Sequence, residues 1–84
     1  MTRDLISRID KIRRDEISLI EDCENYLRNA LLSNNLRIEL GDFRDVILLN
    51  GRVYINFGRF RYGYIEEMYY DDVFTIVKEV ACVL

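Results

Sequence analysis

Residues 3–33 carry a helical pattern of apolar positions. Apolar or small side chains recur every three or four residues, at Leu5, Ile9, Ile12, Leu19, Cys23, Tyr26 and Ala30. This spacing places them on one face of an α-helix. Only Glu16 interrupts the series, and neither glycine nor proline lies within it. The pattern therefore predicts one long helix over about residues 3–33, ended by the asparagines at 34 and 35.

Three turn signals containing glycine follow at nearly even spacing, at Gly41-Asp42, Asn50-Gly51 and Gly58-Arg59. Asn-Gly is the strongest of them, because a type I′ hairpin turn needs a positive φ at both central residues. The segments between the turns alternate apolar and polar residues. They predict four strands, over about residues 36–40, 44–49, 52–57 and 60–65, which form an antiparallel meander in the order 1-2-3-4.

Pairing across these turns gathers the apolar side chains on one face of the sheet. Asn50-Gly51 sets Val46 opposite Ile55, and Gly58-Arg59 sets Ile55 opposite Tyr62. A three-residue loop from Gly41 to Phe43 is preferred to a two-residue turn, because it keeps the apolar side chains of the first strand on the core face. The predicted core face is then Leu36, Ile38, Leu40, Val46, Leu48, Val53, Ile55, Phe57, Phe60, Tyr62 and Tyr64. On the other face, Gly63 lies opposite Tyr54.

Asp71 and Asp72 suit the start of a last helix over about residues 71–83, since acidic groups favour a helix N-terminus. The expected fold is α+β, a single domain over residues 1–84. It combines a long N-terminal helix, the four-stranded antiparallel meander and a short C-terminal helix, with both helices on one face of the sheet. Such a fold supports many unrelated functions.

The composition narrows the classes of chemistry. The chain has 84 residues, no histidine, no proline and two cysteines. Histidine is the commonest general base and metal ligand, so we expect no catalytic residues, no cofactor and no metal site. Cys23 and Cys82 both lie on apolar helical faces, which indicates buried, reduced thiols and an intracellular, cytoplasmic protein. No apolar run is long enough for a membrane span.

The first helix predicts a surface for self-association. Thirty residues of helix span about 45 Å, whereas a strand of six residues spans only about 20 Å. The N-terminal half would therefore overhang the sheet and expose Leu5, Ile9 and Ile12, an apolar stripe that would pair in a homodimer. The alternative is a break in the helix near residues 13–16, after which the N-terminal half folds back.

A second surface is expected where the last strand leads into an acidic turn. Four carboxylates lie within residues 66–72 and surround Tyr69 and Tyr70. Exposed tyrosine is favoured at interfaces, and an edge strand can pair with a partner strand. The predicted partner-binding residues are Arg59, Arg61, Tyr69, Tyr70, Asp71 and Asp72. The alternative is that the C-terminal helix, together with Glu66 and Glu67, covers this edge.

These surfaces favour a non-enzymatic protein-binding module. One alternative is single-stranded nucleic-acid binding through Arg37, Arg52, Arg61 and Tyr54 on the outer sheet face. A second is a small enzyme that uses the acidic cluster. No family motif is present. Shortness, a net charge of −3 and the lack of catalytic equipment resemble the style of small virus-encoded accessory proteins, including inhibitors of host defence, which would act in the host cytoplasm.

Overall fold

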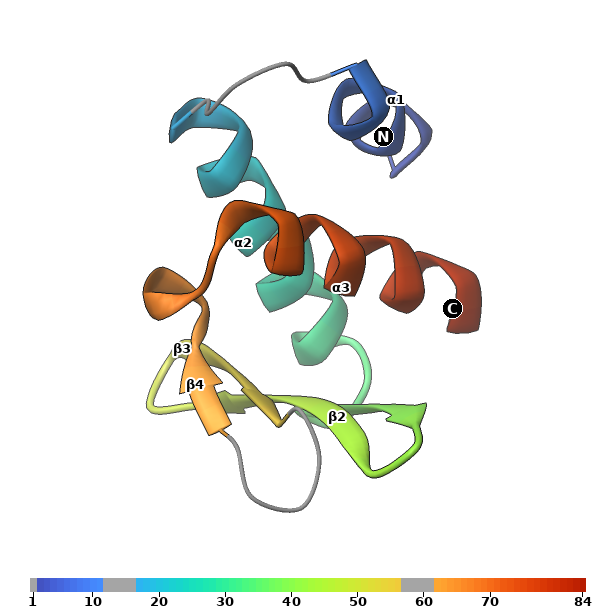
Figure 1. The fold of residues 1–84 in the computed structure, drawn as a ribbon. Coiled ribbons are helices and arrows are strands. Elements are labelled where there is room, and N and C mark those ends of the chain that lie inside the picture. Colours follow the sequence, from blue (N-terminus) through green and yellow to red (C-terminus); the bar gives the residue numbers. More distant parts are fainter. Residues whose placement is uncertain (1, 12–16, 57–61) are drawn as a thin grey trace.

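A computed structural model describes residues 2–11, 17–56 and 62–84 of the chain (Figure 1). Three α-helices, four strands and one short 3-10 helix follow one another in this part. They are α1 (Thr2–Lys11), α2 (Ile17–Leu32), β1 (Arg37–Gly41), β2 (Arg44–Leu49), β3 (Arg52–Asn56), β4 (Tyr62–Tyr64), η1 (Ile65–Glu67) and α3 (Tyr70–Val83). The sheet is antiparallel in the order β1-β2-β3-β4. The expected α+β fold is thereby confirmed.

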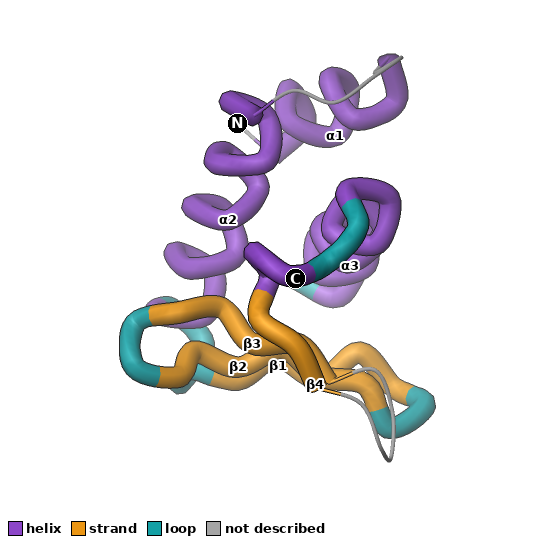
Figure 2. The backbone as a smooth tube through the Cα atoms, turned by 60° about the vertical axis from the view of Figure 1, so that its left-hand side comes forward, coloured by secondary structure: helices purple, strands orange, loops and turns teal. Residues whose placement is uncertain are grey.

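The helices lie on one side of the sheet, as Figure 2 shows. Helix α2 contacts β2 and β3, and α3 contacts β1. Helix α1 packs on α2 and α3, farther from the sheet than either (Figures 1 and 2). The core between these layers is built from apolar side chains of all three helices and the sheet. Its fully buried members include Leu19, Leu27, Leu31, Val46, Val53, Ile55, Val73, Ile76, Val77 and Val80.

The expected single helix over residues 3–33 is instead two helices, α1 and α2, which pack on each other. Folding back is favoured because it buries Leu5 and Ile9, which are only 7% and 4% exposed, whereas an overhanging helix would leave them in water. Ile12 lies outside the described residues. The expected homodimer through Leu5, Ile9 and Ile12 thus lacks the exposed stripe on which it was based, and self-association stays untested.

The hairpin between β2 and β3 has the predicted register. Val46 pairs with Ile55 and Leu48 with Val53. Asn50 and Gly51 have φ values of 53° and 76°, the two positive values that a type I′ turn requires. This hairpin sets which side chains of the central strands face the helices.

The first hairpin reaches the expected core face in another way. Its turn is formed by Asp42 and Phe43, both at positive φ, and a bulge between Glu39 and Gly41 shifts the register. Because the bulge adds one residue, the side chains on the far side of it from the turn change to the opposite face of the sheet. Ile38 therefore pairs with Val46 and is buried. Leu36, expected in the core, is 46% exposed.

Leu36 is exposed because the chain is still reversing where the first strand was expected to begin. Asn35 and Leu36 have φ values of 59° and 67°. The Leu36 N–H donates to the Leu31 carbonyl at 2.8 Å, the hydrogen bond that closes a helix C-terminus. Leu36 therefore belongs to the cap of α2, as the expected role of Asn35 implies, and β1 starts one residue later.

The register between β3 and β4 was predicted wrongly by one residue. Ile55 pairs with Gly63 rather than Tyr62, and Tyr54 pairs with Tyr64 rather than Gly63. Residues 57–61, including the expected turn at Gly58-Arg59, lie outside the described part. This register allows the next inward position to be taken by Ile65, which is 2% exposed. Tyr64 is consequently displaced from the predicted core to the outer face.

The structure confirms the prediction of a buried thiol for Cys23 and corrects it for Cys82. Cys23 of α2 is fully buried, but Cys82 is exposed in the last turn of α3. The buried stripe of α3 ends at Val80, and the residues that follow Ala81, including Val83 and Leu84, are exposed. Within the described ranges, no helix has the length and apolar character needed to cross a membrane.

Candidate protein-binding surface

The turn between the sheet and α3 places Tyr69 in solvent. Ile65 anchors η1 in the core, and the Tyr64 N–H donates to the Glu67 carboxylate at 3.3 Å. Tyr69 is extended, and its carbonyl accepts from the N–H groups of Asp72 and Val73 at 3.0 and 3.1 Å. These bonds start α3. The Tyr69 backbone is therefore held at a helix start while the residue is 83% exposed.

The neighbours of Tyr69 form a shallow hollow of about 330 Å³, lined by Met68, Tyr69, Tyr70 and Asp71. Tyr70 is half-buried, and its ring lies against Phe74 with centroids 6.4 Å apart. The two tyrosines thus differ in role. Tyr70 helps to hold the helix on the core, whereas Tyr69 offers its ring to the exterior. We name the group Met68, Tyr69, Tyr70, Asp71 and Asp72 the Tyr69 surface.

The charges around this surface are negative and only partly neutralised. Glu66 accepts a hydrogen bond from the Arg52 guanidinium at 2.9 Å, and that bond lowers the pKa of Glu66 below its ordinary value. Asp71 and Asp72 are exposed in the first turn of α3. Among the described residues, neither is joined to a cation by an ion pair.

Four of the six predicted partner-binding residues therefore come together, namely Tyr69, Tyr70, Asp71 and Asp72. Arg59 and Arg61 lie outside the described residues. The predicted edge strand is described only over Tyr62–Tyr64, and α3 begins beyond it, after η1. The sequence located the exposed aromatic through its position between acidic residues at a helix start, but did not separate the roles of Tyr69 and Tyr70.

The outer face of the sheet holds a cluster that the sequence did not reveal. The Arg52 guanidinium lies 3.7 Å from the centroid of the Tyr64 ring, and that ring meets Tyr54 edge to face at 4.6 Å. Arg52 also donates to Glu66 at 2.9 Å, and this hydrogen bond raises the pKa of Arg52. The cluster exists because the observed register places Tyr64 beside Tyr54.

A second arginine of this face is also engaged by carboxylates. Arg37 donates to Asp45 at 2.8 Å and lies 3.2 Å from Glu39. Phosphate binding would have to compete with these carboxylates for the guanidinium groups. The outer face thus has the residue types of a single-strand binding sheet, but in Arg37 and Arg52 the charge is matched within the chain.

In the part of the chain that the structure describes, no three His, Cys, Asp or Glu side chains are grouped so that they could hold a metal ion. The carboxylates near Tyr69 are exposed at a helix start.

Compared with protein families, with curated proteins and with solved structures, the chain finds no match in any of the three.

Proposed function

We propose that this chain is a non-enzymatic protein-binding module that engages a basic surface of its partner through the Tyr69 surface. The observation that carries the proposal is the 83% exposure of Tyr69 beside the carboxylates of Asp71 and Asp72, which form no ion pair with any described residue. Large exposed aromatic side chains with a fixed backbone are frequent anchors of protein interfaces, because they bury much area at low entropic cost.

The charge around the anchor supports a basic partner. Asp71 and Asp72 would attract lysine or arginine side chains and speed the encounter, an effect that falls with increasing salt. A bound partner could cover the hollow beside Tyr69 and remove the ring from water. If that basic surface is a working site of a host protein, occupation would block it, which is the inhibitory role implied by the resemblance to virus-encoded accessory proteins.

Single-stranded nucleic-acid binding is less well supported. The candidate cations Arg37 and Arg52 are each within 3.2 Å of a carboxylate, and Arg61 is not among the described residues. An enzyme using the acidic cluster also has little support, because Asp71 and Asp72 lie exposed at a helix start. Protein binding through the Tyr69 surface requires only contact and complementary charge.

The proposal is tested by capture of partners from native cell extract with the purified chain, followed by affinity measurement on the partner identified. Tyr69→Ala should weaken binding by about fivefold or more, since an anchor residue contributes over about 1 kcal/mol. Phe43→Ala is the matched control, because Phe43 is also an exposed aromatic, 68% accessible, but lies in the first hairpin turn.

Charge reversal of Asp71 and Asp72 to lysine should weaken the same binding most at low salt. Both variants should keep the circular dichroism spectrum of the unmodified chain. Binding that survives Tyr69→Ala but is lost with Phe43→Ala would refute the Tyr69 surface. If the affinity depends on the number of phosphates in the bound molecule, and not on a partner protein, the nucleic-acid alternative is supported.

A further inference from the structure

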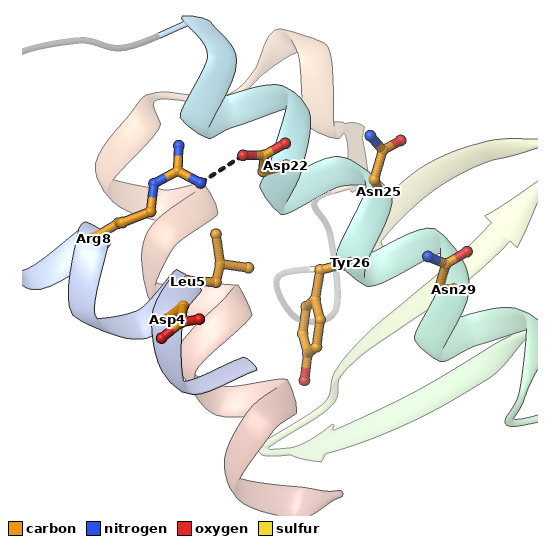
Figure 3. Close-up of a pocket in the computed structure, with 7 residues that line it drawn as sticks. All are labelled: Asp4, Leu5, Arg8, Asp22, Asn25, Tyr26 and Asn29. Carbon is orange, nitrogen blue, oxygen red and sulfur yellow. Dashed lines mark hydrogen bonds and ion pairs between the residues drawn. The ribbon is translucent and has the colours of Figure 1, made fainter. Parts of the chain in front are cut away.

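A separate groove lies between α1 and α2, shown in Figure 3. Its volume is about 390 Å³, within the range of roughly 300–1,000 Å³ typical of small-molecule sites. No residue that lines it belongs to the Tyr69 surface. The groove exists because α1 folds back on α2, so the sequence pattern of one continuous helix could not reveal it.

The apolar wall of the groove comes from both helices. Leu5 of α1 is buried, and Tyr26 of α2 is half-buried. In Figure 3 the Tyr26 ring extends from α2 alongside Leu5, so that the two side chains flank the same space. An aromatic or branched apolar body would find a packing partner in each, and the ring of Tyr26 can also attract a cation over its face.

The polar groups of the groove are unequal in charge. Arg8 donates to Asp22 at 2.6 Å, which neutralises both groups and ties α1 to α2 at one side of the groove. Asp4 lines the same space, and within the described ranges no ion pair joins its carboxylate to a cation. Together these three groups leave one negative charge beside an apolar wall.

We infer that this groove binds a small organic cation, an ammonium or amidinium group carried on an aromatic or branched apolar body. The Asp4 carboxylate holds the cationic group by a charge-assisted hydrogen bond. Leu5 and Tyr26 contact the apolar body. An anion is not accommodated equally, because Arg8, the only cationic side chain among the described residues of the lining, already gives its charge to Asp22.

The test uses three probes that share one aromatic body, namely benzylammonium, benzyl alcohol and benzoate. Each is titrated into the full chain labelled with ¹⁵N, and the backbone amide resonances are followed. Benzylammonium should shift amides of α1 and α2 around Leu5 and Tyr26. Benzyl alcohol should bind about tenfold more weakly, because it lacks the charge, and benzoate should cause no shifts in this region.

Two matched carboxylate variants locate the charge that matters. Asp4→Asn should weaken benzylammonium binding by about tenfold while keeping the amide spectrum of the fold, because Asp4 is exposed. Asp71→Asn, in the first turn of α3, should leave the affinity unchanged. Tyr69→Ala should also leave it unchanged, so this test succeeds or fails independently of the proposed protein-binding surface.

Three results would overturn the inference. Equal affinity for benzylammonium and benzyl alcohol would show that the groove does not recognise charge. Unchanged affinity in Asp4→Asn would remove the carboxylate from the site. Amide shifts centred on Tyr69 instead of α1 and α2 would place the cation at the other acidic surface.

Discussion

Ile9 tests whether α1 belongs to the core of the single chain. Its side chain is 4% exposed in a helix that packs on α2 and α3. Replacing a buried isoleucine with alanine removes apolar contacts and leaves a cavity, at a cost of about 2–5 kcal/mol. Because α1 is the outermost layer, its surroundings can close over part of the space, and we expect the lower end, about 2–3 kcal/mol.

For a chain of this size, that loss corresponds to a fall in Tm of about 10–20 °C. The assay is urea unfolding of Ile9→Ala followed by circular dichroism, at two protein concentrations that differ tenfold. Ser7→Ala is the control, because Ser7 is exposed on the same helix and its replacement should change the free energy of unfolding by less than about 0.5 kcal/mol.

If Ile9→Ala unfolds at the same urea concentration as the unmodified chain, α1 does not contribute to the cooperative core. If the variant instead changes from dimer to monomer in sedimentation, with a stability that depends on protein concentration, Ile9 serves the self-association first expected from the sequence. Either outcome would refute the packing of α1 described above.

Three further predictions concern backbone and thiol chemistry. Gly51→Ala should lower the free energy of unfolding by about 1–2 kcal/mol, because φ is 76° at this position. Gly63→Ala should be nearly neutral, because its φ is not positive and the added methyl group meets no atom within 4 Å. Equal urea midpoints for the two variants would contradict this prediction. Burial raises the pKa of Cys23 to about 11, so the unfolded chain loses this proton first. Relative to Cys23→Ala, stability should be constant below about pH 9 and fall by about 2–3 kcal/mol by pH 11; parallel pH profiles would disprove it. Cys82 should react with a thiol reagent in the native state within minutes, and Cys23 only on unfolding. Mass spectrometry counts the labels: one label on the native chain agrees with this prediction, and two labels contradict it.

The sequence could predict the central hairpin because its turn has one strongly preferred geometry. Asn50 and Gly51 accept positive φ together, and the pairing of Val46 with Ile55 follows directly. The sheet order follows from short connections in the same way. The exposed Tyr69 was also predictable, since an aromatic side chain between acidic residues at a helix start has little apolar surface to cover it.

Other features depended on competition between distant parts of the chain. The register of β4 follows whether Tyr64 or Ile65 takes the inward position, and alternation alone fits both. The break between α1 and α2 depends on the packing of α1 against both α2 and α3, which buries Leu5 and Ile9, and α3 lies far along the chain. The groove beside Asp4 is formed by that packing, so no local sequence pattern could predict it.

The bulge in β1 bears on how this chain avoids aggregation. As the edge strand of the described sheet, β1 has no neighbouring strand on one side among the described residues, and the chain has no proline with which to interrupt that side. The register shift between Glu39 and Gly41 breaks the even spacing that a regular incoming strand would need to match. The extra residue that turns Ile38 into the core thus also makes this edge a poor template for fibril growth.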